Sequence, residues 1–301
     1  MDIITVSPRG YCKGVIRAIN IAKKTKQDNP TSKITILGMI VHNKYVVEAC
    51  ENLGIVCLDA KGKTRLELLD EINEGIVLIT AHGVSDQVIK KAKDKGLTIV
   101  DATCVDVIKT HDIVKNHINN GDVIYIGKKT HPEAEGVIAL SDKVHLVSCK
   151  EDIDNLKELK NVLITNQTTM SLLDIDYLIK ECLIKFKDAK VYEEICNATR
   201  VRQEAIKNLE NIDVLFVVGD ISSNNSNQLK NIALDSGIKK AFLIETSNDI
   251  TKDMLNDVVS IGVTSGASTP TYLTTQVIDV LNHYIETKEL IHLNVDISKI
   301  I

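Results

Sequence analysis

The sequence predicts an α/β protein made of three similar lobes that are related by a pseudo-threefold axis, in a trefoil-like arrangement. Short β-branched runs alternate with helical patterns along all 301 residues, which is typical of parallel sheets joined by crossover helices. Three cysteines, Cys12, Cys104 and Cys196, recur at equal intervals of 92 residues. Polar loops follow each cysteine at similar distances. These observations together indicate three copies of one unit of roughly 90 residues, about the size of a small domain.

Nine β-branched runs are predicted as strands: Ile3–Val6, Ile34–Leu37, Ile76–Ile79, Thr98–Asp101, Val123–Ile126, Val162–Thr165, Ala189–Tyr192, Val214–Val218 and Val258–Val263. Four stretches between them have helical periodicity: Val15–Lys26, Gln87–Lys95, Asp174–Phe186 and Arg202–Leu209. In parallel sheets, functional loops gather where strands end and helices begin. We therefore expect the functional residues at these junctions.

The polar loops divide the chain into three repeats. One loop of each repeat holds His42, His131 or Ser223, which lie 30, 27 and 27 residues after the preceding cysteine. A later loop of each repeat holds His82, Thr168 or Ser268, at distances of 70, 64 and 72 residues. We predict lobes over residues 1–103, 104–195 and 196–301, the last with a C-terminal tail. Such lobes would aim three cysteines and three pairs of loops at one point.

The composition excludes several classes of function. Aromatic residues make up 3% and Trp is absent, which argues against stacking platforms for single-stranded nucleic acid. The net charge of −5 argues against a broad phosphate-backbone-binding face. No signal peptide and no apolar run of about 20 residues is visible. We expect a cytoplasmic monomer with no nucleic-acid or membrane partner, in a compartment where thiols stay reduced.

The seven cysteines fall into two groups. Cys50, Cys57, Cys149 and Cys182 lie in apolar runs or helical patterns and are interpreted as small core residues. The other three have glycine or small polar neighbours, as in Arg-Gly-Tyr-Cys-Lys-Gly around Cys12. Such neighbours suit loops that approach a ligand closely. Equal spacing makes independent burial a poor explanation for these three.

Three thiolates could hold either of two metal centres. Structural zinc usually uses four protein ligands in close Cys-x-x-Cys pairs, which this sequence lacks. A 4Fe–4S cluster held by three cysteines would keep one iron open for substrate or water. The spacing favours such a catalytic cluster, although it does not by itself separate the cluster from a Cys₃His zinc site.

The polar loops are interpreted as an anion pocket. His42, His82 and His131 occupy equivalent loops beside Thr168, Ser223, Asn225 and Ser268, and all of these side chains can donate hydrogen bonds to phosphate oxygens. Each His taken alone fits a structural or solvated role as well. Ser268 precedes Thr269 and Pro270 and fits equally well as a simple helix cap.

Glu133, in His-Pro-Glu-Ala-Glu-Gly, is the carboxyl that we expect to face the cluster. A carboxyl near a cluster and an anion should be hard to ionise, which suits a proton donor. The alternative is an acid that interacts with a helix dipole, and that role fits Glu135 better.

Several motifs together resemble the IspH/LytB family. They are Arg9-Gly10-Tyr11-Cys12-Lys13-Gly14-Val15, Val41-His42-Asn43, Ala81-His82-Gly83, Asp101-Ala102-Thr103-Cys104, His131-Pro132-Glu133, Gln167-Thr168-Thr169, Ile195-Cys196-Asn197 and Gly262 to Ser268. The family comprises 4-hydroxy-3-methylbut-2-enyl diphosphate reductases, which catalyse the last step of the methylerythritol phosphate route to isoprenoids. The motifs occur in order along nearly the whole chain.

The resemblance implies a trefoil-like fold around a 4Fe–4S cluster bound by Cys12, Cys104 and Cys196. It implies reduction of the allylic alcohol diphosphate to isopentenyl and dimethylallyl diphosphates, with electrons from a flavodoxin or ferredoxin. Glu133 and Thr168 would serve proton delivery. The residues implied to hold the diphosphate are His42, His82, His131, Thr168, Ser223, Asn224, Asn225 and Ser268.

Two residues depart from the family pattern. Asn224 stands where Ser is usual, and its amide can still donate a hydrogen bond. Val105 replaces the usual Pro after the second cysteine. Two other functions stay open at this point: a non-redox dehydratase that uses the open iron as a Lewis acid, and an iron–sulfur sensor without catalysis. Dependence on a reductant separates the first from a reductase. A requirement for the Glu133 carboxyl would separate a reductase from the sensor.

Overall fold

A computed structural model describes residues 1–301 and confirms the predicted α/β class. Twelve strands form three parallel sheets of four strands each. The strands are β1 (Asp2–Thr5), β2 (Ile34–Leu37), β3 (Val56–Leu58), β4 (Ile76–Ile79), β5 (Thr98–Asp101), β6 (Val123–Ile126), β7 (Val144–Val147), β8 (Leu163–Asn166), β9 (Lys190–Val191), β10 (Val214–Val218), β11 (Lys240–Ile244) and β12 (Ser260–Ser265). Sheet A has the order β1-β12-β10-β11, sheet B β3-β2-β4-β5, and sheet C β7-β6-β8-β9.

Helices connect the strands. They are α1 (Lys13–Asp28), α2 (Lys44–Asn52), α3 (Arg65–Leu68), α4 (Asp86–Asp94), α5 (Val105–His117), α6 (Pro132–Ile138), α7 (Lys150–Asn155), α8 (Leu172–Lys185), α9 (Asn197–Lys207), α10 (Asn224–Asp235) and α11 (Thr271–Thr287). Four 3₁₀ helices complete the fold: Leu69–Glu71, Ser247–Asp249, Lys252–Leu255 and Ile297–Lys299. None of the helices combines the length and apolar character that a membrane span requires.

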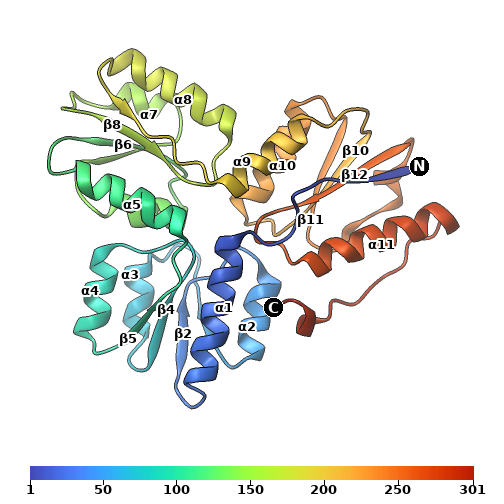
Figure 1. Ribbon diagram of the computed structural model, residues 1–301, viewed down its shortest axis with the longest axis horizontal. Coiled ribbons are helices and arrows are strands. Elements are labelled where there is room, and N and C mark those ends of the chain that lie inside the picture. Colours follow the sequence, from blue (N-terminus) through green and yellow to red (C-terminus); the bar gives the residue numbers. More distant parts are fainter. The chain divides into compact units, whose positions relative to one another are not determined.

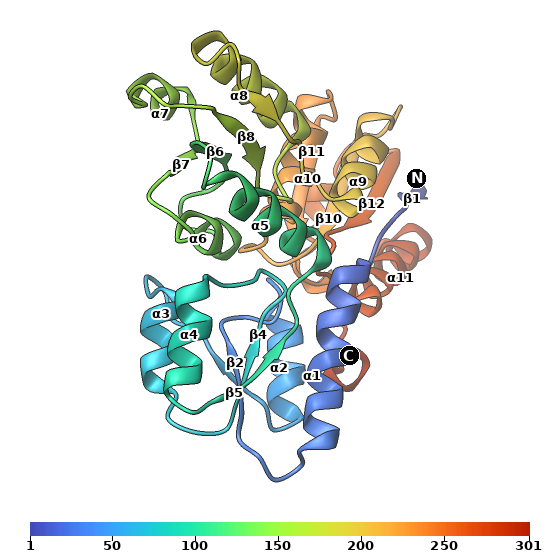
Figure 2. The same cartoon turned by 60° about the vertical axis from the view of Figure 1, so that its left-hand side comes forward.

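The chain divides into two compact units. Unit 1 comprises residues 1–16, 42–49 and 197–301 and contains sheet A, while unit 2 comprises residues 17–41 and 50–196 and contains sheets B and C. In unit 1, α9 and α10 pack on one face of sheet A, and α11 lies along the other face (Figure 1). In unit 2, α3 and α4 cover one face of sheet B (Figure 2).

The three sheets share one strand order. If the strands are numbered in the order in which they occur in a repeat, they lie across the sheet as second, first, third and fourth. In sheet B the four strands are β2, β3, β4 and β5, and in sheet C they are β6 to β9. In sheet A the first three are β10, β11 and β12, and β1 takes the fourth place, with Ile3 opposite Ile261. The strand that precedes Cys12 therefore belongs to the sheet formed by the end of the chain. The predicted lobe boundaries at 103/104 and 195/196 stay a prediction.

Three strands were not predicted: β3, β7 and β11. Each is an edge strand of its sheet and is only partly buried. Fully buried parallel strands have continuous apolar sequences. The strands β2, β4, β6 and β10 are buried along their whole length and have such sequences. None of the three contains two adjacent β-branched residues, so the sequence pattern did not reveal them.

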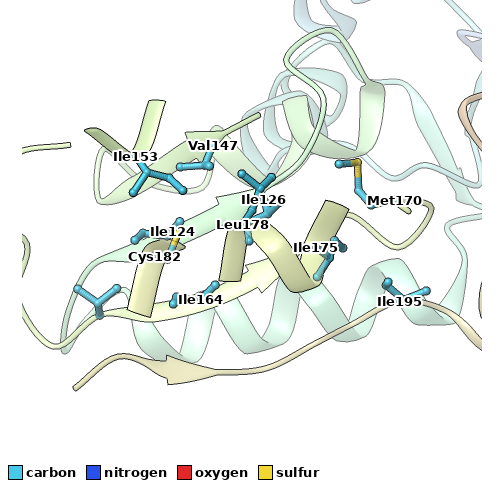
Figure 3. Packing of buried hydrophobic residues seen from close by; sticks show 11 residues of the cluster. Ile124, Ile126, Val147, Ile153, Ile164, Met170, Ile175, Leu178, Cys182 and Ile195 are labelled. Atoms are coloured by element: carbon cyan, nitrogen blue, oxygen red, sulfur yellow. The ribbon is translucent and has the colours of Figure 1, made fainter. Parts of the chain in front are cut away.

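Sheet C shows how alternating side chains bury both faces of a strand. Val123 and Tyr125 of β6 belong to a cluster with residues of α5 and α6. Ile124 and Ile126 point to the opposite face, against Ile153 of α7 and residues of α8 such as Leu178 (Figure 3). This period of two is the geometry of a strand. The cluster that contains Val123 and Tyr125 holds α6 against β6.

We predict that Ile164→Ala lowers the free energy of unfolding by about 2–5 kcal/mol. Ile164 lies on β8 in the cluster of Figure 3 and is fully buried, so truncation leaves a cavity. Urea denaturation measures the change. Ile184→Ala is the matched control, because Ile184 is 69% exposed on α8 and should change the free energy by at most about 0.5 kcal/mol. Equal effects of the two substitutions would contradict the assigned core.

Candidate functional site

Each of the three predicted cysteines stands directly before a helix, at the carboxyl end of the fourth strand of a sheet. Cys12 precedes α1, Cys104 is the N-cap residue of α5, and Cys196 precedes α9. None of the three forms a disulfide, and each is of intermediate exposure. The dipole of a helix stabilises negative charge at its N-terminus. The three positions therefore suit thiolate ligands.

The three cysteines are held by the same backbone contact. The amide of Cys12 donates to the carbonyl of Ala267 at 2.9 Å, that of Cys104 to Ala81 at 3.0 Å, and that of Cys196 to Thr168 at 3.1 Å. The accepting residues lie in the three loops predicted to end the repeats. Each cysteine is thus tied to the loop that follows the neighbouring third strand of its own sheet. This contact ties each predicted cysteine to a predicted polar loop of the same unit.

The other four cysteines do not share this setting. Burial raises the pKa of Cys50 and Cys182 to about 11 and that of Cys57 to about 12. Cys149 is exposed, so its predicted place in the core is wrong, and its amide donates to Asp152 at the start of α7. Three of these thiols are thus disfavoured as thiolates, and the fourth belongs to the exposed N-cap residue of α7. The donor set that suits an iron–sulfur cluster is the predicted trio.

Within unit 2, Glu133 and Thr168 form a close pair. The Thr168 amide donates to Glu133 Oε1 at 2.8 Å, and the Thr168 hydroxyl lies 2.9 Å from Glu133 Oε2. Glu133 is in the first turn of α6 and is 1% exposed, while Thr168 is 4% exposed. Since Thr168 also accepts the Cys196 amide, a continuous set of contacts joins this carboxyl to one of the cysteines.

Burial raises the pKa of Glu133 to about 7. Loss of hydration disfavours the charged form, and the hydrogen bonds from Thr168 and Tyr125 only partly oppose this effect. Asp106 on α5 raises the pKa further. A carboxyl with a pKa near neutrality can hold and release a proton at physiological pH, which is the property of a general acid.

This pKa predicts a pH-dependent stability. Because protonation of Glu133 is favoured in the folded state, its contribution is fully present below the ordinary pKa of 4.5 and is lost as the pH rises through about 7. We expect the Tm of Glu133→Gln relative to the unsubstituted protein to be higher above about pH 7 than below about pH 4.5. Thermal unfolding at several pH values measures this. A constant difference would show that Glu133 ionises normally.

Two of the predicted histidines meet in unit 2. The rings of His82 and His131 lie edge to face, with centroids 5.5 Å apart. Thr80 contacts His82 Nδ1 at 3.3 Å, and His131 Nδ1 accepts the Glu133 amide at 3.2 Å. The second contact makes His131 the N-cap of α6, with Pro132 as the first helical residue. This cap orients both the His131 ring and the Glu133 carboxyl.

Unit 1 brings together the remaining predicted residues. Ser223 caps α10, and Asn224 and Asn225 are the first residues of that helix. The amide oxygen and nitrogen of Asn225 have no hydrogen-bond partner although the residue is 5% exposed. In the same unit, Ser268 donates to the backbone carbonyl of His42 at 3.0 Å. Buried polar atoms without partners are costly, so an amide such as that of Asn225 suits contact with a ligand.

Each of the two departures from the family pattern is the first residue of a helix. Val105 is the first residue of α5 and is 60% exposed, so it occupies a position where Pro is favoured but not required. Asn224 is the first residue of α10 and is 6% exposed. Its side-chain amide is longer than the usual Ser side chain and can donate two hydrogen bonds where the Ser hydroxyl donates one.

The sequence interpretation missed Tyr125. This residue lies in a run of apolar residues, Val123 to Ile126, which by itself predicts only a buried strand. The structure shows that its hydroxyl contacts Glu133. The signal available in the sequence was a phenol in an otherwise aliphatic strand, because a buried hydroxyl requires a partner.

Comparisons with known proteins identify the family of this chain. Residues 3–282 match the family described as LytB protein. The chain is 47% identical over 289 residues to the 4-hydroxy-3-methylbut-2-enyl diphosphate reductase of Bacillus cytotoxicus, covering 94% of this chain and 91% of that protein. It is 45% identical over 293 residues to the enzyme of the same name from Halalkalibacterium halodurans, covering 96% and 93%.

A solved structure is similar as well. The E-1-hydroxy-2-methyl-but-2-enyl-4-diphosphate reductase from Plasmodium falciparum superposes with a TM-score of 0.86 and 31% identity, over 93% of this chain and 87% of that one. The family match spans most of the sequence, and the relatives align over nearly their whole lengths. This chain belongs to the LytB protein family.

Proposed function

We propose that this protein reduces 4-hydroxy-3-methylbut-2-enyl diphosphate to isopentenyl and dimethylallyl diphosphates. The observation that carries the proposal is the Glu133–Thr168 pair, a buried carboxyl with a pKa of about 7 held beside a cysteine loop. Relatives at 45–47% identity are named as reductases of this diphosphate. The reaction takes up two electrons and two protons and releases the allylic hydroxyl as water.

The proposed cofactor is a 4Fe–4S cluster held by Cys12, Cys104 and Cys196. Their position before helices and their shared backbone contact support a common role. Three protein thiolates leave one iron without a protein ligand. When bound, the cluster would supply electrons and a Lewis-acidic iron for the substrate hydroxyl.

The proposed diphosphate ligands are His42, His82, His131, Thr168, Ser223, Asn224, Asn225 and Ser268. Two features support this assignment. The first is the set of neutral hydrogen-bond donors at the starts of α6 and α10, where the helix dipole favours an anion. The second is the buried Asn225 amide, which has no partner in the protein. Fixing the diphosphate would hold the allylic end of the substrate in one orientation.

In this proposal Glu133 delivers the proton that leaves with water. Its neutral form holds a proton at Oε2, opposite the Thr168 hydroxyl at 2.9 Å. Thr168 can pass that proton on, because a hydroxyl accepts one hydrogen bond while it donates another. The low exposure of both side chains excludes bulk water from the relay.

Anaerobic purification tests this function. We expect about four irons and four sulfides per chain, and turnover of the allylic diphosphate only when a reductant is present. A reduced flavodoxin or ferredoxin is the proposed physiological donor, and dithionite with a viologen is the chemical substitute. Product formation without any electron donor would favour a dehydratase. A tetrahedral zinc site in place of iron would exclude the proposed chemistry.

A further inference from the structure

Tyr125 is a buried phenol that contacts the proposed proton donor. It lies on β6 and is 0% exposed, and its ring packs in the cluster that includes Ala134 and Val137 of α6. The Tyr125 hydroxyl donates to Glu133 Oε1 at 3.3 Å. This contact is longer than the two contacts from Thr168, so its effect should be smaller than theirs.

The strand is built to admit this ring. A Cβ at Gly127 would lie 2.9 Å from Tyr125 Cε1, closer than side-chain atoms tolerate. Gly127 follows β6 directly, so the absence of a side chain there leaves room for the phenol. A Phe would fill the same space with no polar atom to satisfy. The hydroxyl is therefore the feature of Tyr125 that packing does not explain.

The two oxygens of Glu133 have different partners. Oε1 accepts from the Tyr125 hydroxyl and from the Thr168 amide, whereas Oε2 has the Thr168 hydroxyl. Two donors occupy both lone pairs of Oε1. A proton on the neutral carboxyl is then directed to Oε2, where it can be donated to the Thr168 oxygen.

We propose that Tyr125 is a positioning residue that keeps the transferable proton of Glu133 on Oε2, facing the Thr168 hydroxyl. The proposal rests on the proposed function, in which Glu133 is the proton donor. Without the phenol, Oε1 keeps one donor only, and the proton can occupy either oxygen. A proton on Oε1 is directed away from the Thr168 hydroxyl and is not productive.

The other groups around the carboxyl do not replace this contact. Asp106 on α5 acts on Glu133 only through its negative charge. His131, which precedes α6, accepts the Glu133 backbone amide through its Nδ1. Thr168 occupies one lone pair of Oε1 through its amide. The second lone pair is filled by Tyr125 alone.

The test is Tyr125→Phe in the cluster-loaded enzyme. We expect kcat to fall about 5- to 10-fold, a fraction of the 10²- to 10⁴-fold attributed to general acid catalysis, with KM within about twofold because the phenol touches no substrate. Loss of a donor to the charged form raises the pKa of Glu133. The decline of kcat at alkaline pH should therefore move to higher pH.

Infrared difference spectroscopy gives a readout that does not depend on turnover. The C=O band of protonated Glu133, identified by its absence in Glu133→Gln, should move to higher wavenumber in Tyr125→Phe because Oε1 loses a donor. Tyr177→Phe is the matched control, since Tyr177 lies half exposed on α8 and its hydroxyl should not affect either the band or kcat.

The outcomes separate the two proposals. A lower kcat with both the band and the alkaline limb shifted supports the positioning role. An unchanged Tyr125→Phe enzyme beside an inactive Glu133→Gln enzyme overturns the role of Tyr125 and leaves the function intact. A lower kcat with neither shift also overturns it, because packing alone would explain that loss. A fully active Glu133→Gln enzyme overturns the assignment of the proton donor itself.

Discussion

Replacing Glu133 by Gln is expected to lower kcat for the allylic diphosphate by about 10²- to 10⁴-fold, the usual contribution of a general acid. Gln has nearly the same shape and keeps an acceptor for the Thr168 amide, so the fold of the loop should persist. It cannot release a proton to the Thr168 hydroxyl, which lies 2.9 Å from Oε2 in the unsubstituted protein. Steady-state kinetics with dithionite-reduced viologen measure the loss.

Glu135→Gln is the matched control for this prediction. Glu135 lies on the same helix, two residues further on, and its carboxylate accepts the backbone amide of Arg65 at 2.7 Å. Gln at this position keeps an acceptor, and no proton transfer is assigned to it. We expect activity within about twofold of the unsubstituted enzyme. If both variants lost activity equally, the effect would arise from α6 and not from the proton of Glu133.

The second large effect is expected for Cys104→Ser. A hydroxyl is a much poorer iron ligand than a thiolate, so the purified variant should hold well below one iron per chain in place of about four. Activity should become undetectable. Iron and sulfide analysis and electron paramagnetic resonance of the reduced protein measure the cluster directly, independently of turnover.

Cys149→Ser serves as the control because it removes an exposed thiol at the start of α7. Its iron content and kcat should match those of the unsubstituted enzyme. A comparable loss of iron in both variants would indicate that iron binding is not specific to the predicted cysteines. An intact cluster in Cys104→Ser would require a different ligand set.

These two predictions also distinguish an enzyme from an iron–sulfur sensor. A sensor needs the cluster but no proton donor, so Glu133→Gln should leave its output unchanged. A reductase needs both. The buried setting of Glu133, which raises its pKa to about 7, favours the enzyme because strongly perturbed pKa values cluster at catalytic sites.

The sequence alone identified the fold class and nine of the twelve strands. The predicted bounds of β2, β4, β5, β6 and β10 agree with the structure residue for residue. Continuous runs of β-branched residues make such strands recognisable. The strands β3, β7 and β11 were missed because none of them contains two adjacent β-branched residues.

The spacing of the cysteines also predicted which loops lie together. Cys104 and Ala81 lie more than twenty residues apart, yet their loops were expected to converge because strand ends share one edge of a parallel sheet. The backbone contact of 3.0 Å between them agrees with that expectation. The substrate, in contrast, came from the family resemblance, since spacing carries no information on the chemistry of a ligand.

What the sequence by itself determined is the set of chemical groups: three cysteines at strand ends, polar loops and one carboxyl. Tertiary structure decided two further features. It paired β1 with β12, so the N-terminal strand completes the sheet formed by the end of the chain. It also buried Glu133 among Thr168 and Tyr125, which sets its pKa. Both results depend on long-range packing, because strand partners and desolvation are properties of neighbours in space and not of neighbours in sequence.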